Sequence, residues 1–140
     1  MKKRRKTVLV VLAVIAVLVI IAVGAMQRLE SNMEELRELT FEKIDLSSME
    51  DGNYTGSFSS FPVAAEVQVT IEEQAITKVE LLEHSHGMGE DAEVLPAMVE
   101  KAQNLDVDVI SGATYSSIVI LKAIEDALIY EQEDVNDRSS

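Results

Sequence analysis

The sequence predicts an α+β domain, with a small antiparallel sheet and two packed helices, preceded by a single N-terminal transmembrane helix. Three observations support this prediction. Residues 7–25 form an apolar run without any charge, residues 53–83 contain short segments that alternate between apolar and polar side chains, and residues 115–130 carry apolar side chains at helical spacing. The length of 140 residues leaves room for one domain of modest size in addition to the anchor.

The N-terminal segment predicts a membrane anchor. Residues 1–6 are a basic cluster, and as a helix the uncharged run 7–25 spans close to the ~30 Å hydrocarbon core of a bilayer. The positive flank predicts a cytoplasmic N-terminus, so we expect a single-pass cell-membrane protein whose domain is extracytosolic. The alternative is a cleaved signal peptide, with Val23-Gly24-Ala25 as the cleavage site. We favour an uncleaved anchor because the apolar run is longer than a signal core of about 7–15 residues.

Residues 26–50 predict a connector between the anchor and the domain. Leu29, Met33 and Leu36 recur at helical spacing among acidic side chains. They indicate either a helical stalk or a short seam for self-association. We favour the stalk, because the pattern covers fewer heptads than a coiled coil requires.

The domain itself is predicted over residues 51–130 and begins with a meander of three strands, 53–60, 64–72 and 76–83. The middle strand alternates clearly, with Val67, Val69 and Ile71 directed inward. Gly56 in the first strand permits a close approach or a bulge. The turn at residues 72–75 lacks the glycine-containing pair that tight hairpins prefer, which leaves its geometry open.

The second half of the domain predicts two helices and one more strand. After a mobile connection at residues 84–89, a helix is expected over 90–103, either starting near Pro96 or kinked there. A last strand is expected at 106–110, followed by a helix at 115–130. Residues 131–140 are expected to be a polar, frayed tail.

The turn between this last strand and the last helix is the main functional candidate. It reads Asp108-Val109-Ile110-Ser111-Gly112-Ala113-Thr114-Tyr115-Ser116-Ser117. Gly112 permits a positive φ or a close approach to a ligand, and Thr114, Ser116 and Ser117 can cap the helix. The N–H groups and the dipole of the helix N-terminus favour a phosphate group at this place.

This stretch resembles the flavinylation motif of the FMN-binding domain family, which includes the FMN-bearing subunits of Rnf-type and sodium-translocating NADH:quinone reductase complexes. Asp108, Ser111, Gly112, Ala113 and Thr114 carry the resemblance, and Gly52, Tyr54 and Gly56 match the element that opens the small version of the domain. The similarity covers residues 51–129. It implies that a flavin transferase uses FAD to attach FMN, through its phosphate, to Thr114.

On this resemblance we expect a membrane-anchored electron-transfer flavoprotein with FMN as its cofactor. The alternatives are an unflavinylated interaction or sensory module of the same fold, and a noncovalent FMN binder. The expected partners are a flavin transferase, a membrane oxidoreductase and extracytosolic redox proteins. The expected cofactor-binding residues are Thr114, Ser111, Gly112, Ala113, Asp108, Tyr115, Ser116, Ser117, Tyr54, His84 and His86.

Several of these residues have structural alternatives. Asp108 either orients the attachment machinery or stabilises the turn through an Asx hydrogen bond. Tyr54 and Tyr115 either pack on the flavin or lie at the edge of the core, and for Tyr54 we favour the core edge. His84 and His86 alone are weak evidence for a metal site, so no metal ligands are expected.

The composition excludes several functions. The net charge is -13, and residues 1–25 contribute +5, which leaves -18 on the rest and argues against nucleic-acid binding. The absence of cysteine excludes disulfides, iron–sulfur clusters and c-type haem attachment. No nucleophile–base pair and no glycine-rich phosphate loop are found, so we expect a redox carrier without catalytic residues of its own.

Overall fold

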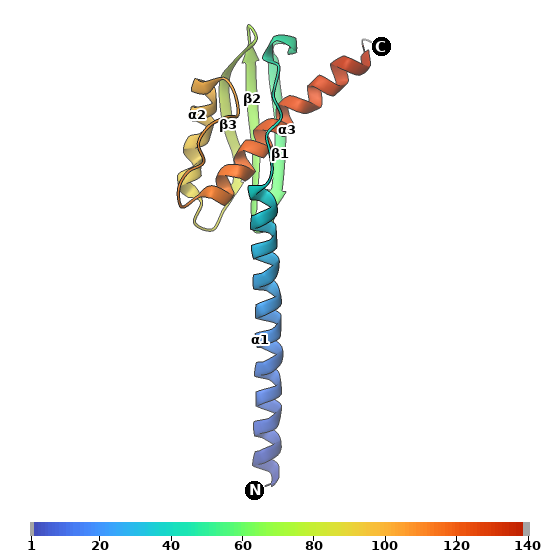
Figure 1. Cartoon of the computed structure of the whole chain (residues 1–140), viewed down its shortest axis with the longest axis vertical. Helices are drawn as coiled ribbons and strands as arrows, with labels where there is room; N and C mark the ends of the chain where they lie inside the picture. The colour runs from blue at the N-terminus through green and yellow to red at the C-terminus, as the bar shows by residue number, and fades with distance from the viewer. Residues whose placement is uncertain (1, 139–140) are drawn as a thin grey trace. The chain divides into compact units, whose positions relative to one another are not determined.

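The computed structural model describes residues 2–138, without the side chains of residues 2–5, 29, 32, 33, 37 and 130–138. The chain divides into two compact units, one ending at Glu35 and one beginning at Leu36. The order of elements is α1 (Lys2–Arg37), η1 (Leu46–Ser48), β1 (Gly52–Ser60), β2 (Val63–Glu72), β3 (Ala75–Ser85), η2 (Glu90–Val94), α2 (Leu95–Ala102) and α3 (Thr114–Arg138), of which Figure 1 labels the longer ones.

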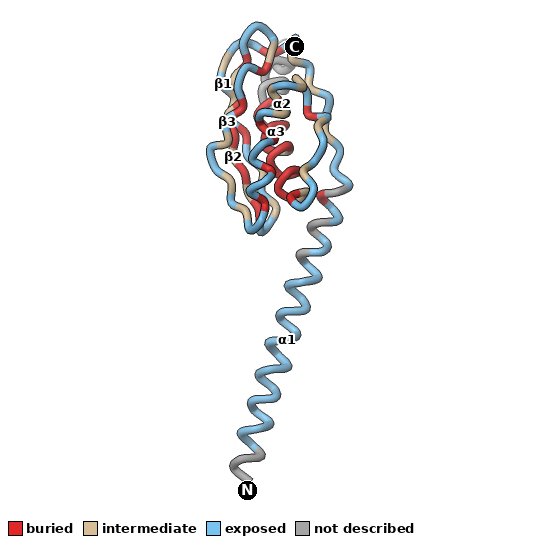
Figure 2. Tube along the Cα trace, turned by 90° about the vertical axis from the view of Figure 1, so that its left-hand side faces the viewer, coloured by how far each residue is buried: buried red, intermediate tan, exposed pale blue. Residues whose placement is uncertain are grey.

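The first unit consists of most of helix α1. Its segment Lys6–Arg28 has a mean hydropathy of 3.4 over its most apolar window and is exposed throughout, as the pale blue tube in Figure 2 shows. By length and composition this helix can cross a membrane. The side chains of Leu29 and Met33 and most of the basic cluster lie outside the described residues.

The second unit begins before the expected start of the domain. Leu36 and Met49 are buried in the hydrophobic core, and Phe41, Ile44 and Leu46 pack against it. Asp45 caps the short helix η1, where the hydroxyl and then the backbone N–H of Ser47 lower the pKa of the Asp45 carboxyl. The expectation of a free helical stalk up to residue 50 is therefore wrong for residues 36–50, because their apolar side chains have a core to cover.

The three strands form the expected antiparallel meander in the order β1-β2-β3. Val67, Val69 and Ile71 of β2 are fully buried, as their alternation predicted. The turn between β2 and β3 places Glu73 at φ 51° and Gln74 at φ 63°, the geometry of a type I′ turn adopted without glycine. The turn between β1 and β2 contains Phe61 and Pro62, joined by a cis peptide bond.

Strand β3 is longer than expected and contains two irregularities in its pairing with β2. The register shifts between Thr70 and Ile71 and between Glu66 and Val67, so that Thr77 and Leu82 of β3 are extra residues. The second shift places His84 opposite Ala65 and on the same face as Val79 and Leu81. The expected mobile connection at 84–89 is therefore wrong for His84 and Ser85, which belong to the strand.

Both helices of the domain pack on one face of the sheet (Figure 1). Helix α3 lies over β1 and β2, and α2 lies against β3. The buried residues, red in Figure 2, are concentrated between the sheet and these helices. The backbone of α3 continues to Arg138, beyond the expected end at residue 130. The remainder of the expected polar tail, residues 139 and 140, lies outside the described residues.

Pro96 lies in the first turn of α2, so the helix starts near Pro96 and is not kinked there. The preceding residues Glu90–Val94 form the short 3-10 helix η2. Side chains of α2 satisfy the edge of β3: Glu100 accepts from the backbone N–H of Val79 at 2.6 Å, and Gln103 accepts from Ile76 N–H at 2.8 Å. These bonds cover an edge that would otherwise be open to another strand.

The expected strand at 106–110 is wrong, because these residues have no strand structure. The alternation of Val107 and Val109 is that of a strand, but the edge of β3 is already occupied by side chains from α2. The backbone N–H of Ile110 instead donates to the hydroxyl of Ser117, at 3.0 Å. Residues 106–110 thus form an irregular segment that leads into α3.

Candidate functional site

The turn before α3 has the geometry that its glycine predicted. Gly112 has φ +84°, a left-handed conformation that glycine adopts without strain. The N–H of Ala113 donates to the carbonyl of Ile110 at 2.9 Å, which closes the turn. Ser111 and Gly112 are exposed, whereas Ala113 is buried beneath them. The turn therefore presents its glycine and the preceding serine to solvent at the N-terminus of α3.

Ser117 holds this turn against the first turn of α3. Its hydroxyl donates to the carbonyl of Ala113 at 2.8 Å and accepts from the N–H of Ile110 at 3.0 Å, and the residue is fully buried. A serine hydroxyl has only one hydrogen to donate. Ser117 therefore has a structural role, and it is not a hydrogen-bond donor for a ligand at the surface.

Thr114 is the first residue of α3 and is half-buried. Within the part of the chain that the structure describes, its hydroxyl takes part in no hydrogen bond. A threonine that caps a helix would accept a hydrogen bond from a backbone N–H of the first turn. Thr114 does not do so, and the turn is instead stabilised by Ser117.

Tyr115 joins this helix terminus to the turn between β1 and β2. Its hydroxyl lies 2.8 Å from the hydroxyl of Ser60, 3.1 Å from the carbonyl of Ser60 and 2.9 Å from the carbonyl of Phe61. Tyr54 lies near the opposite end of β1, and its hydroxyl donates to the carbonyl of Glu50 at 2.5 Å. Ser60 follows Tyr54 by six positions along the strand, a distance of roughly 20 Å, so the structure does not bring Tyr54 to Thr114.

The two histidines, in contrast, come close to the start of α3. A Cβ atom placed on Gly89 would lie 1.9 Å from the hydroxyl oxygen of Ser116 and 3.4 Å from the Cβ of His86. The segment 86–89 therefore lies directly on the first turn of α3. Ser116 is buried at this contact.

His84 and His86 share one carboxylate, that of Glu93. The Nδ1 atom of His84 lies 3.1 Å from Oε1 of Glu93, and the Nε2 atom of His86 lies 3.5 Å from the same oxygen. The two imidazole rings have their centroids 4.5 Å apart. The side chain of His84 is only 2% exposed, because the irregularity at Leu82 turns it towards the helices.

Asp108 is exposed, and in the described part of the chain its carboxylate makes no hydrogen bond or ion pair. The alternative of an Asx-type turn at Asp108 is therefore not observed. Such a turn occurs instead at Asn104, whose side-chain oxygen accepts from the N–H of Asp106 at 2.8 Å.

Sequence reasoning missed two residues beside this site. Phe61 follows Ser60, whose hydroxyl contacts the hydroxyl of Tyr115. The residue is 77% exposed, although aromatic side chains usually bury much of their surface. Glu93 was placed in a helix without a role, and only the fold brings it to the histidines. Met88, in the loop after β3, is 94% exposed beside Gly89. The sequence signal for Phe61 was its position next to Pro62, and the exposure of its side chain is visible only in the structure.

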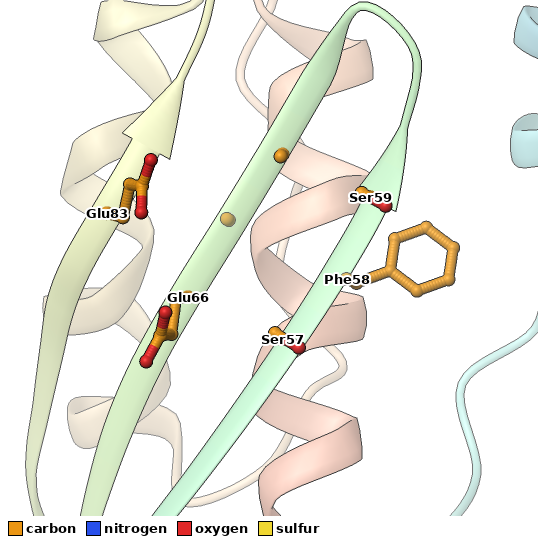
Figure 3. A pocket seen from close by; sticks show the side chains of 7 residues that line it. Ser57, Phe58, Ser59, Glu66 and Glu83 are labelled. Carbon is orange, nitrogen blue, oxygen red and sulfur yellow. The ribbon is translucent and has the colours of Figure 1, made fainter.

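Among the described residues, shallow depressions are found on the sheet, two of which are not lined by the turn before α3. One, of about 430 Å³, lies on the face away from the helices between Ser57, Ser59, Glu66 and Glu83 (Figure 3). The other lies around Asp51, Asn53 and Glu72 at the far end of the sheet. The surroundings of Thr114 are thus defined by the helix terminus and by the exposed side chains around it.

Comparison with protein families gives one match. The model of the FMN-binding domain family matches residues 63–129, from the start of β2 to the second half of α3. The match includes the turn at 108–113, Thr114, both histidines and Glu93. It leaves out β1 with Gly52, Tyr54 and Gly56. No curated protein matches the chain.

Proposed function

Residues 63–129 belong to the FMN-binding domain family, whose cofactor is FMN, and on this basis we propose that the chain is an electron-transfer flavoprotein with FMN linked covalently to Thr114. The observation that supports this proposal most strongly is the hydroxyl of Thr114. It lies on the first residue of a long helix, it is half-exposed, and its neighbour Ser117 performs the stabilising role that it would otherwise have.

The residues around Thr114 fit a phosphoester at this position. The N–H groups of the first helical turn have no partners within the helix and carry the positive end of its dipole, which favours a phosphate. Gly112, at φ +84° and without a side chain, leaves open space beside the turn, since a Cβ there would meet nothing within 4 Å. Ser111 is exposed and can supply a hydroxyl donor, whereas Ser117 cannot.

The attachment reaction is a substitution at phosphorus. The Thr114 Oγ1 atom forms a bond to the FMN phosphorus of FAD and loses its proton, while the pyrophosphate bond breaks and AMP leaves. In this scheme a flavin transferase supplies the catalytic groups, and Asp108, exposed and without a partner in the described chain, is available to that enzyme.

FMN, once attached, supplies the redox chemistry, and the domain supplies the attachment point and the local environment. Tyr115 fixes the β1–β2 turn beside the helix terminus, and the exposed side chains of Phe61 and Met88 lie on the two segments that contact this terminus. We assign these side chains, with His86, as the apolar and polar surroundings of the ring. A covalent link makes a deep binding cavity unnecessary.

Helix α1 completes the proposal. Its segment Lys6–Arg28 is long and apolar enough to cross a membrane. With the basic residues on the cytoplasmic side, the domain would lie outside the cytosol. There it would transfer electrons between a membrane oxidoreductase and an extracytosolic acceptor. A bound but unlinked flavin could be lost there, and this favours a covalent link.

The test is an intact-mass measurement on the full chain, co-expressed with an active flavin transferase. The wild-type chain should gain the mass of FMN less one water, and Thr114→Val, which keeps the branched shape but lacks the hydroxyl, should gain nothing. Ser59→Ala removes another exposed hydroxyl and should leave the modification intact. A wild-type chain that gains no mass would contradict the covalent link. If that chain still retains FMN after gel filtration, it is a noncovalent FMN binder.

A further inference from the structure

We propose that His84, His86 and Glu93 form a binding site for a divalent transition-metal ion of the Zn²⁺ type. One ligand atom from each of the three residues lies within 4.8 Å of the other two. Both imidazoles approach the same carboxylate oxygen, at 3.1 and 3.5 Å. In a tetrahedral zinc site with bonds of about 2.0–2.1 Å, neighbouring ligand atoms lie about 3.3 Å apart, so the two histidine-to-Glu93 separations suit an ion between them.

The fold, rather than the sequence spacing, brings these ligands together. His84 lies in the last part of β3 and His86 follows the end of the strand at Ser85, and the irregularity at Leu82 turns His84 inward. Glu93 comes from η2, which packs against α3 next to the strand end. The end of β3 and the residue after it thus supply the two imidazoles, and the short helix η2 supplies the carboxylate.

Each imidazole also has a second ring nitrogen, other than the one that approaches Glu93. The Nε2 atom of His84 and the Nδ1 atom of His86 are buried, and neither has a hydrogen-bond partner in the described residues. These are not the nitrogens that approach Glu93, so the proposal rests on the Glu93-facing atoms and not on these two. The only ion-pair partners of Glu93 in the described chain are the two imidazoles.

The ligand types select the class of ion. Neutral imidazole nitrogens with one carboxylate suit Zn²⁺ and its first-row neighbours, whereas Mg²⁺ and Ca²⁺ prefer sites made of oxygen atoms. The surroundings are acidic, with Glu90 and Asp91 exposed in the same short helix, and they favour a cation electrostatically.

An ion at this site would also affect the start of α3. It would hold the segment 86–89, which contacts Ser116, two residues from Thr114. A bound ion would therefore help to fix the conformation of the candidate flavin site around Thr114. The metal site itself does not depend on the proposed flavin attachment, because its ligands are the chain's own side chains.

The site can be tested with the full chain in detergent micelles, as the Thr114→Val variant, so that no flavin is attached. Titration with Zn²⁺ in a calorimeter should show one saturable site, and the thermal midpoint should rise with Zn²⁺ but not with Mg²⁺. Since the chain has only two histidines, binding by imidazole can come only from this pair. Glu93→Gln and His86→Gln, each at a partly exposed side chain, should weaken the affinity at least about tenfold.

Glu90→Gln is the matched control, because it removes one exposed acid from the same short helix without removing a proposed ligand. Its affinity for Zn²⁺ should fall far less than that of Glu93→Gln, because only the general electrostatic attraction is reduced. Absence of saturable binding, or equal losses in Glu90→Gln and Glu93→Gln, would overturn the proposal and leave only general attraction to an acidic surface. Repeating the titration on the Thr114 parent separates this result from the outcome of the flavinylation test.

Discussion

Gly56 of β1 lies directly against the backbone of α3 at Ala127. A Cβ atom on Gly56 would lie 2.2 Å from the nitrogen of Ala127 and 2.3 Å from the carbonyl oxygen of Ala123. The small side chains of Ala123 and Ala127, both buried, allow the helix to approach the strand this closely. This contact fixes the position of α3 on the sheet, and therefore the position of its first residue, Thr114.

Gly56→Ala should therefore destabilise the domain strongly. The atoms that the new methyl group would meet belong to the helix backbone and cannot move aside alone, so we expect a loss of about 3 kcal/mol. Gly52→Ala is the matched control on the same strand, because its Cβ would meet only Tyr54 at ordinary contact distances of 3.7 Å or more. Denaturant unfolding of both variants tests this, and equal midpoints would contradict the close packing of α3 on β1.

Ser117→Ala should loosen the turn before Thr114. The substitution removes one hydrogen bond to the carbonyl of Ala113 and leaves the partly buried N–H of Ile110 without its partner, a loss of about 1–3 kcal/mol. Ser111→Ala, at an exposed serine in the same turn, should change stability by less than about 0.5 kcal/mol. If both variants unfold alike, Ser117 does not hold the turn.

The Ser117→Ala variant also distinguishes an effect on the stability of the turn from a direct effect on flavin attachment. If Thr114 carries FMN as proposed, Ser117→Ala should slow flavinylation because Thr114 is less well positioned, and the modified fraction should recover at lower temperature, where the turn is more ordered. Time courses of the intact mass at two temperatures measure this effect. A Ser117→Ala chain that is as stable as the parent and yet entirely unmodified would show that this hydroxyl has a direct role.

The sequence predicted the parts of the fold that depend on periodicity. The alternation of β2 and the helical spacing after Thr114 are confirmed, because each element buries one regular face. Segment 106–110 was mispredicted, since a strand pattern forms a strand only where an edge is free, and Glu100 and Gln103 occupy that edge. The strand propensity of residues 106–110 does not reveal that side chains of α2 compete with them for the edge of β3.

The candidate site was predictable only in part, for a related reason. The turn and Thr114 are local, so their motif is visible in the sequence. The approach of His84 to Glu93 depends on the extra residue Leu82 in β3, and a bulge cannot be located from alternation alone. Likewise, the separation of Tyr54 from Thr114 follows from the direction of β1, which composition does not reveal.

Glu83→Lys should stabilise the domain. Glu66 and Glu83 are directly opposite each other on neighbouring strands, on the face away from the helices (Figure 3). Like charges in such a pair are destabilising, and an opposite pair contributes roughly 0.2–1 kcal/mol. The gain should shrink in high salt, because the pair is on the surface. Glu80→Lys, which removes the partner of Lys78 at 2.9 Å, should not stabilise, and urea midpoints at low and high salt compare the two.

The contact between Gly89 and Ser116 holds the segment 86–89 against the first turn of α3, and it can be tested directly by substitution. Gly89 has φ −102°, which alanine also adopts, so any cost of Gly89→Ala comes from packing rather than from the backbone. The new Cβ would lie 1.9 Å from the oxygen and 2.6 Å from the Cβ of Ser116, so the segment 86–89 must move away from α3. We expect a loss of about 1–3 kcal/mol.

Ser116→Gly removes both of the atoms that cause this clash, at a cost of about 1 kcal/mol for glycine in a helix. The double variant should therefore be more stable than the sum of the single losses predicts, with a coupling of at least about 1 kcal/mol. Chemical denaturation of the four chains measures this coupling. Additive losses would mean that the histidine-bearing segment and the first turn of α3 are not in contact, and would separate the two candidate sites.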